Sequence, residues 1–168
     1  LTIQQMAQRF DDPDAFIEAA MDPTLLARVG IDRPTLEGFL MPNTYFFDGE
    51  PSEKDVVLRM VEQFEHDYAD LLSEYPHAAE RDKVEVVTIA SLVEEEARVD
   101  DERPVISAVI HNRLELGRPL QLDCTLQYAL NKYGERMLYR DKEVDSPYNS
   151  YKNRGLPPGP ISNPGKAC

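Results

Sequence analysis

The sequence predicts one domain of the α+β class, predominantly α-helical with a small β or extended component, over residues 1–168. Apolar residues recur at helical spacing through most of the chain, and helix start signals precede several of these segments. One stretch, residues 36–52, has no helical period and is rich in aromatic residues, glycine and proline. At 168 residues, the chain is long enough to bury an ordinary core.

Short helices are predicted in the N-terminal third. Thr2 and Gln5 form a capping-box pattern ahead of the first apolar residues. Residues 12–13 and 22–23 each read Asp-Pro, which places an N-cap before a proline at the first helical position. Gly30 is a helix stop. Residues 36–52 then predict short extended segments and turns.

A long amphipathic helix is predicted from about residue 52 to residue 74. Ser52 and Asp55 cap its start, and Pro76 ends it. Its apolar stripe comprises Val57, Met60, Val61, Phe64, Tyr68, Leu71 and Leu72.

Three further helices are predicted at about residues 84–99, 101–116 and 124–130. Gly117 stops the second of them, and Asp123 is expected to cap the third. The last stretch, residues 146–168, is loop by composition because proline, glycine and asparagine dominate it.

Composition excludes several function classes. Acidic residues outnumber basic ones by 31 to 18, for a net charge of −13, which argues against nucleic acid and against anionic membrane surfaces as partners. No apolar run reaches the roughly 18 residues of a membrane span. Without CxxC, HExxH or histidines at ligand spacing, no metal or cofactor is predicted. Whether Cys124 and Cys168 pair remains open.

Three consecutive glutamates, residues 94–96, end the apolar helix at 84–99. If Val86, Ile89, Ala90, Val93 and Ala97 form its buried face, the 100° step per residue directs the three carboxylates differently. Glu95 then points away from the core, Glu94 lies on a flank, and Glu96 points inward.

An inward carboxylate at the edge of an apolar stripe is partly desolvated, which favours its protonated form. A general acid near neutral pH needs this property, and cleavage of a glycosidic bond needs such an acid. The pattern alone leaves a second interpretation open, in which Glu96 pairs with a neighbouring arginine on the surface.

Several blocks of the chain, in order, resemble the endolytic murein transglycosylase (MltG or YceG-like) family. The family's A-S-[IL]-[IV]-E-x-E matches residues 90–96, and E-R, N-R-L and L-Q-x-D-P-T-x-x-Y match residues 102–103, 112–114 and 120–128. Residues 37–45 and 146–165 resemble its E-G-x-x-x-P-[DN]-T-Y and Y-N-T-Y…G-L-P-P-G-x-I-x-x-P-G blocks. Cys124 stands where the family usually has proline, and Ser150 where threonine is common.

This resemblance implies a lysozyme-like or YceG-like catalytic domain that cuts peptidoglycan glycan strands as a lytic transglycosylase. Glu96 matches the family's catalytic glutamate, the residue that the helical-face argument also selects. As general acid and then base, it would cleave the bond between N-acetylmuramic acid and N-acetylglucosamine and leave 1,6-anhydro ends. No cofactor is implied.

Further polar residues in these blocks are candidates for sugar binding, each with a structural alternative. Asp123 is otherwise the cap of its helix, Asn149 a turn residue, and Asn112 a tie between helices. Gln121 and Tyr151 are predicted to lie in loops, where their polar groups are available to bind hydroxyl or N-acetyl groups of a sugar. The roles of Glu37, Glu94 and Arg113 stay undecided.

The family also has an N-terminal transmembrane helix, a LysM-like domain and a C-terminal segment, so the resemblance implies a catalytic-domain fragment. It implies a location on the outer side of the cytoplasmic membrane, held there through the anchor alone, with peptidoglycan synthases as neighbours. Two alternatives remain: a lysozyme-like muramidase that uses water, with Asp123 as the best second carboxylate, and a non-catalytic glycan-binding scaffold.

Overall fold

The computed structural model describes residues 1–168 and is almost entirely helical. Seven α-helices follow in order: α1 (Ile3–Ala7), α2 (Pro13–Ala19), α3 (Pro23–Val29), α4 (Glu53–Glu74), α5 (Lys83–Glu96), α6 (Arg103–Glu115) and α7 (Asp123–Leu130). Three 3₁₀ turns, η1 (Pro76–Glu80), η2 (Asp100–Glu102) and η3 (Tyr139–Glu143), lie between or after them. The predominance of helix is therefore confirmed.

The expected β component is absent. The only strand-like pairing is an isolated bridge between Pro119 and Arg154. Residues 36–41 form a turn at positions 37–38 instead of a strand, and the backbone amides of the segment bond elsewhere: Leu36 to the carbonyl of Ala20 at the end of α2, and Gly38 and Leu40 to the side chain of Asn163. Because helix ends and a side chain satisfy these groups, no second strand is required.

The predicted N-terminal helix caps are present. Thr2 and Gln5 make the reciprocal capping box, and Ser52 and Asp55 make a second one. Asp12 and Asp22 accept hydrogen bonds from backbone N–H groups of α2 and α3. These signals are local, so residues a few positions apart suffice to specify them.

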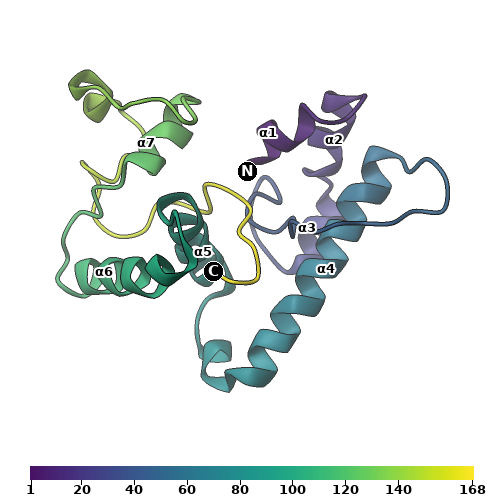
Figure 1. Cartoon of the computed structure of the whole chain (residues 1–168), viewed down its shortest axis with the longest axis horizontal. Helices are drawn as coiled ribbons and strands as arrows, with labels where there is room; N and C mark the ends of the chain where they lie inside the picture. Colours follow the sequence, from purple (N-terminus) through teal and green to yellow (C-terminus); the bar gives the residue numbers. More distant parts are fainter.

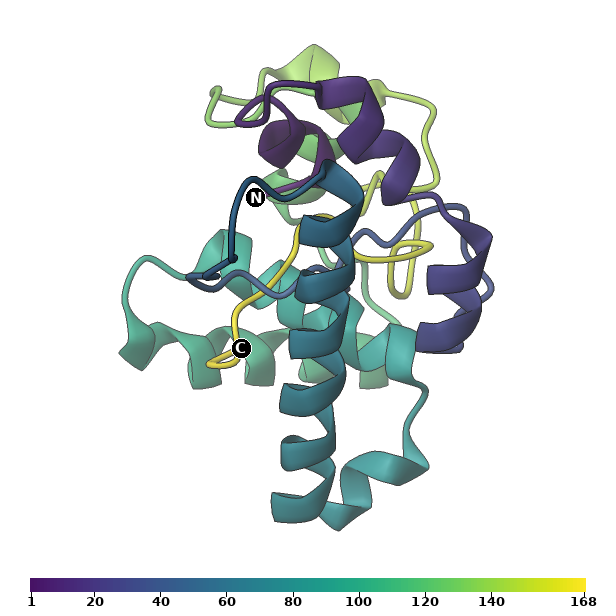
Figure 2. The same ribbon diagram turned by 90° about the vertical axis from the view of Figure 1, so that its right-hand side faces the viewer.

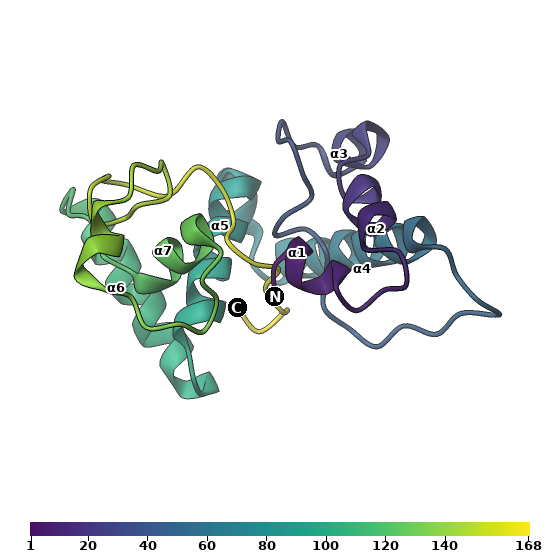
Figure 3. The same ribbon diagram turned by 90° about the horizontal axis from the view of Figure 1, so that it is seen from above.

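Two hydrophobic cores lie side by side, joined by α5. The first contains 20 buried residues, most from α1–α4 and the segment 36–41, and the second contains six, most from α5–α7. In Figure 1 the helices α1–α4 occupy the right side, α6 and α7 the left, and the yellow C-terminal segment runs between them. Figure 3 shows the same separation from above, with both chain ends near the centre.

Helix α4 is the longest element and supports the first core. Its buried apolar side chains, Val56, Val57, Met60, Val61 and Phe64, belong to the same core as those of α1–α3 and of residues 36–41. Figure 2 shows α4 running from below the purple N-terminal helices to the bottom of the molecule. The ring of Phe64 packs edge-to-face on Phe39 at a centroid distance of 5.1 Å.

Helix α5 differs from its prediction in two respects. It ends at Glu96 because Ala97 is extended, with ψ 130°, and the Arg98 N–H bonds to the Glu102 carboxylate instead. Its buried residues are Val87, Thr88, Ser91, Leu92 and Val93, so only Val93 of the predicted face is buried. The polar side chain of Ser91 can be buried because its hydroxyl donates to the Thr88 carbonyl and accepts from the Ile161 N–H.

Helix α6 also begins later than predicted. Residues 100–102 form the 3₁₀ turn η2, and α6 starts at Arg103, with Pro104 in its first turn. The turn between α5 and α6 is thus tight, and it places the end of α5 beside the start of α6.

Candidate active site

Glu96 ends α5 at the rim of an open depression of about 530 Å³. Arg98, Asp101, Glu102, Val105 and Ile106 line the rest of it. The Glu96 side chain is partly exposed, and its carboxylate makes no ion pair and no hydrogen bond to a protein nitrogen or oxygen. The Cys124 thiol donates a hydrogen bond to this carboxylate, which otherwise opens onto the depression and is accessible for proton transfer.

The other two glutamates of the triplet have different surroundings. Glu94 accepts hydrogen bonds from the Arg103 guanidinium and the Gly165 N–H, both at 3.3 Å, and from the Cys168 thiol at 3.0 Å. Burial opposes its charge, yet these donors lower the pKa of Glu94 below its usual value. Glu95 is exposed to solvent. Of the three, only Glu96 lines the depression.

The start of α7 lies next to Glu96. Cys124, in the first turn of α7, is buried, and this burial raises the pKa of its thiol well above the usual range, with the charge of Glu96 adding to the shift. Both Cys124 and Cys168 are free thiols. Cys168 lies beside Glu94, where burial raises the pKa of its thiol to about 12.

Asp123 and Tyr151 meet at this end of α7. The Tyr151 hydroxyl donates to Asp123 Oδ1 at 2.6 Å. Burial raises the pKa of Tyr151, the hydrogen bond to Asp123 raises it further, and Glu96 and Arg113 contribute smaller shifts of opposite sign. The Lys142 ammonium lies 4.3 Å from the centre of the Tyr151 ring. Tyr151, Asp123, Arg113 and Glu96 therefore share one electrostatic neighbourhood.

The predicted cap role of Asp123 is wrong. The N-cap of α7 is Leu122, no side chain caps this helix, and Asp123 is its first helical residue. The Asp123 carboxylate is exposed and directed to Tyr151, whose position 28 residues later no local cap rule includes.

Asn149 is a structural turn residue, the alternative to sugar binding that the sequence left open. It is fully buried, its amide nitrogen donates to the carbonyls of Lys142 and Val144 at 2.9 Å each, and its oxygen accepts from the Tyr151 N–H. Its amide group is therefore committed within the loop, and its contribution to the site is to shape the backbone that carries Tyr151.

Gln121 and Asn112 are both exposed. Gln121 has a positive φ of 55° and directly precedes the segment that starts α7. Asn112 lies on α6, and no hydrogen bond joins it to another predicted site residue. Arg113, its neighbour, donates to the Leu120 carbonyl and so connects α6 to the segment before α7.

Sequence patterns missed Arg98, Asp101 and Lys142 as neighbours of the site. Arg98 and Asp101 line the depression with Glu96, and Lys142 covers the Tyr151 ring. Arg98 and Asp101 were missed because the helix was predicted to continue to about residue 99. The chain instead turns after Glu96, and this turn brings both residues to the depression. Lys142 carries no pattern that distinguishes it from a surface lysine.

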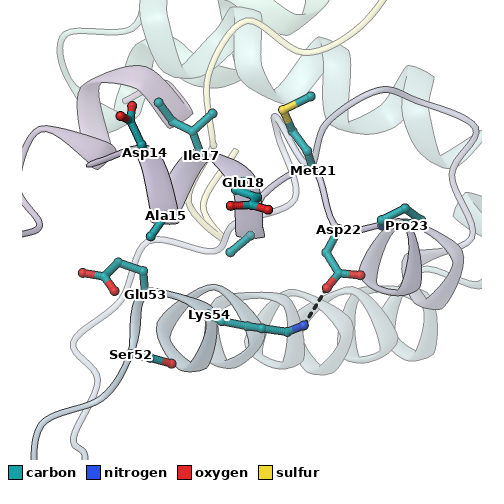
Figure 4. Close-up of a pocket in the computed structure, with 11 residues that line it drawn as sticks. Asp14, Ala15, Ile17, Glu18, Met21, Asp22, Pro23, Ser52, Glu53 and Lys54 are labelled. Carbon is teal, nitrogen blue, oxygen red and sulfur yellow. Dashed lines mark hydrogen bonds and ion pairs between the residues drawn. The ribbon is translucent and has the colours of Figure 1, made fainter. Parts of the chain in front are cut away.

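A larger cavity, of about 720 Å³, lies in the first half of the molecule between α2, α3 and the start of α4. Figure 4 shows its acidic side chains and the ion pair of 2.8 Å between Lys54 and Asp22. The hydrogen bond from Lys54 lowers the pKa of Asp22 to about 2. None of the predicted site residues lines this cavity.

One group of side chains, His66, Asp67 and Asp70, has metal-ligand types within 4.8 Å of one another. The Lys166 ammonium lies 3.1 Å from Asp67 and 3.2 Å from Asp70. These carboxylates therefore already balance a protein cation, as in a surface ion-pair cluster. None of the seven α-helices combines the length and the apolar composition that a membrane span requires.

Comparison with known proteins gives consistent matches along the whole chain. The model of the YceG-like family matches residues 1–168. The endolytic murein transglycosylase of Bacillus subtilis (strain 168) is 46% identical over an alignment of 134 residues that covers 77% of this chain and 36% of that protein. That of Streptococcus pneumoniae serotype 2 (strain D39) is 33% identical over an alignment 178 positions long, which covers 98% of this chain and 31% of that protein.

The fold also matches a solved structure. A crystal structure of a yceG-like protein from Listeria monocytogenes superimposes with a TM-score of 0.84 at 33% identity, covering 99% of this chain and 62% of that one. The chain spans about a third of the length of the curated relatives it matches.

Proposed function

Because the chain belongs to the YceG-like family, we propose that it is the catalytic domain of an endolytic peptidoglycan lytic transglycosylase with Glu96 as its acid and base. The observation that carries the proposal is the contrast within the glutamate triplet. Glu94 is committed to Arg103 and the C-terminal segment, whereas Glu96 lines an open depression with no protein nitrogen or oxygen bound to it.

In the proposed reaction, protonated Glu96 gives its proton to the glycosidic oxygen between N-acetylmuramic acid and N-acetylglucosamine. The bond from that oxygen to muramic C1 breaks, and the N-acetylglucosamine part leaves with the proton. The Glu96 carboxylate then takes the proton of the muramic C6 hydroxyl, whose oxygen bonds to C1 and closes a 1,6-anhydro ring. Because the nucleophile belongs to the substrate, one carboxylate suffices.

Hydrolysis by a muramidase is the second candidate, and one observation favours it. Asp101, an exposed carboxylate, lines the same depression as Glu96, and a second carboxylate is what an enzyme that activates water requires. Asp123, the partner expected from the sequence, is instead bonded to Tyr151.

Substrate and location follow from the same proposal. Peptidoglycan strands lie outside the cytoplasmic membrane, so the domain would face the wall, with peptidoglycan synthases as neighbours that supply new strands. Gln121, Asp123, Tyr151 and Asn112 remain the proposed sugar contacts, since each has an exposed or partly exposed polar group.

Mass spectrometry of the products from purified sacculi tests the proposal. The wild-type protein should release fragments with anhydromuramic ends, Glu96→Gln should release none, and Glu95→Gln should match the wild type. Reducing-end fragments would replace the lyase with the muramidase. Equal glycan binding without products from any variant would favour the non-catalytic scaffold.

A further inference from the structure

Two segments that border the candidate site run side by side. Pro119 and Arg154 form the isolated bridge, and the Gln121 N–H donates to the Ser150 carbonyl at 3.0 Å. Gln121 is one of two non-glycine residues with positive φ, the other being Asn131 at the end of α7. A left-handed backbone costs a non-glycine residue on the order of 1 kcal/mol, so the surrounding contacts must hold it.

The Ser150 backbone carbonyl contacts Gln121 itself, and the Ser150 hydroxyl fixes the residues that follow Gln121. Its Oγ accepts a hydrogen bond from the Leu122 N–H at 3.0 Å and lies 2.8 Å from Thr125 Oγ1. Thr125 Oγ1 in turn lies 2.8 Å from the Leu122 carbonyl. Ser150 is 4% exposed and Thr125 fully buried, so water cannot replace either hydroxyl. One side chain thus joins the loop at 150 to the N-cap of α7.

This junction lies between exposed groups of the site. Tyr151 follows Ser150 and donates to Asp123, which follows Leu122. The next residue, Cys124, has its thiol within the electrostatic influence of Glu96. A shift at the junction would therefore displace Gln121, Asp123 and Tyr151 together relative to Glu96.

We propose that Ser150 is a positioning residue for the glycan-cleaving reaction: its buried hydroxyl fixes the segment with Gln121 and Asp123 at its working distance from Glu96. Ser150 does not touch substrate, because it is buried. The inference rests on the proposed function, since it concerns the geometry around that acid. Misplacement of reacting groups by about 1 Å costs an enzyme up to roughly 100-fold in rate.

Three variants test this role. Ser150→Ala removes the hydroxyl and leaves the Leu122 N–H without its acceptor. Ser150→Thr keeps the hydroxyl and has the residue that is common at this position in the family motif. Ser162→Ala is the matched control, because Ser162 is equally buried and its hydroxyl has no hydrogen-bond partner. Release of anhydro-ended fragments is measured over a range of sacculus concentrations, well below each variant's unfolding temperature.

For Ser150→Ala, we expect kcat to fall about 10- to 100-fold at an unchanged folded fraction. Ser150→Thr and Ser162→Ala should stay within about threefold of the wild type. Suppose that the wild type is active and that the kcat of Ser150→Ala is unchanged, or that its activity falls only in proportion to its unfolded fraction. Either result would overturn the positioning role and leave the proposed function standing. A wild type without anhydro products would overturn the proposed function and this inference with it.

Discussion

The Asn163 side-chain amide donates to the Glu37 carboxylate at 2.7 Å, in a buried contact that joins the C-terminal segment to the first core. The same carboxylate accepts from the Ile3 N–H, and the Asn163 oxygen accepts from Gly38 and Leu40. Glu37 and Asn163 therefore link α1, the segment 36–41 and the C-terminal segment. The undecided role of Glu37 is thus structural in this fold.

Stability should depend on pH through Glu37. Burial raises the pKa of Glu37 from 4.5 to about 7 in the folded state, despite the donors that favour its charge. The folded protein therefore holds this proton more tightly than the unfolded chain does. The resulting stability is fully present below pH 4.5 and is lost as pH rises through about 7.

The variant Glu37→Gln should remove this dependence. Urea unfolding at pH 5 and pH 8 should show a loss on the order of 3 kcal/mol for the wild type and a much smaller one for the variant. Parallel pH profiles for the two proteins would mean that Glu37 titrates normally in the fold.

Gly38 should tolerate no side chain. Its φ is +93°, and a Cβ there would lie 2.4 Å from Pro160 Cγ. Gly38→Ala should destabilise the protein by about 3 kcal/mol, because backbone strain adds to a clash. Gly49→Ala is the control: φ is +100°, yet nothing lies within 4 Å of its Cβ, so only the strain of about 1 kcal/mol should appear. Equal melting temperatures for the two variants would contradict the clash.

Substitutions in the glutamate triplet should affect stability at one position and activity at another. Glu94→Gln should lower the unfolding free energy by about 1–3 kcal/mol, since the Arg103 guanidinium, 23% exposed, loses a charged partner. Glu96→Gln should leave stability unchanged and abolish product release, and Glu95→Gln should change neither. Thermal melts and product assays on the three proteins check this. A stability loss at Glu96→Gln equal to that at Glu94→Gln would show that Glu96 is a structural residue.

The Tyr151 hydroxyl should matter for turnover. Tyr151→Phe removes the 2.6 Å hydrogen bond to Asp123, and we expect an activity loss of about tenfold with little change in melting temperature. Tyr139→Phe is the control, because Tyr139 is 91% exposed. If both variants keep full activity, the orientation of Asp123 by Tyr151 has no part in the reaction.

Sequence patterns predicted the features whose causes are local. The capping boxes at Thr2 and Ser52 and the Asp-Pro starts of α2 and α3 depend on residues within one helical turn, and all four form. The selection of Glu96 as the inward glutamate stays a prediction, because it assumed a buried face of which only Val93 is buried.

The errors have nonlocal causes. The buried face of α5 was misassigned because Ser91 and Thr88 are polar, and the partner that makes Ser91 burial tolerable, Ile161, comes 70 residues later. Asp123 was assigned as a helix cap because its actual partner, Tyr151, comes 28 residues later, beyond the reach of any local capping pattern. Asn149 fits both a turn and a binding pattern, and only its burial distinguishes them.

The link at Asn163 also has a consequence for the order of folding. Its hydrogen bonds to Glu37, Gly38 and Leu40 span 123 to 126 residues, which are among the most nonlocal contacts of the chain. During synthesis on the ribosome, helices α1–α4 emerge first, while the buried polar groups of residues 37–40 still lack their partner. The first core can therefore close completely only after residue 163 has left the exit tunnel, and high contact order makes this closure slow.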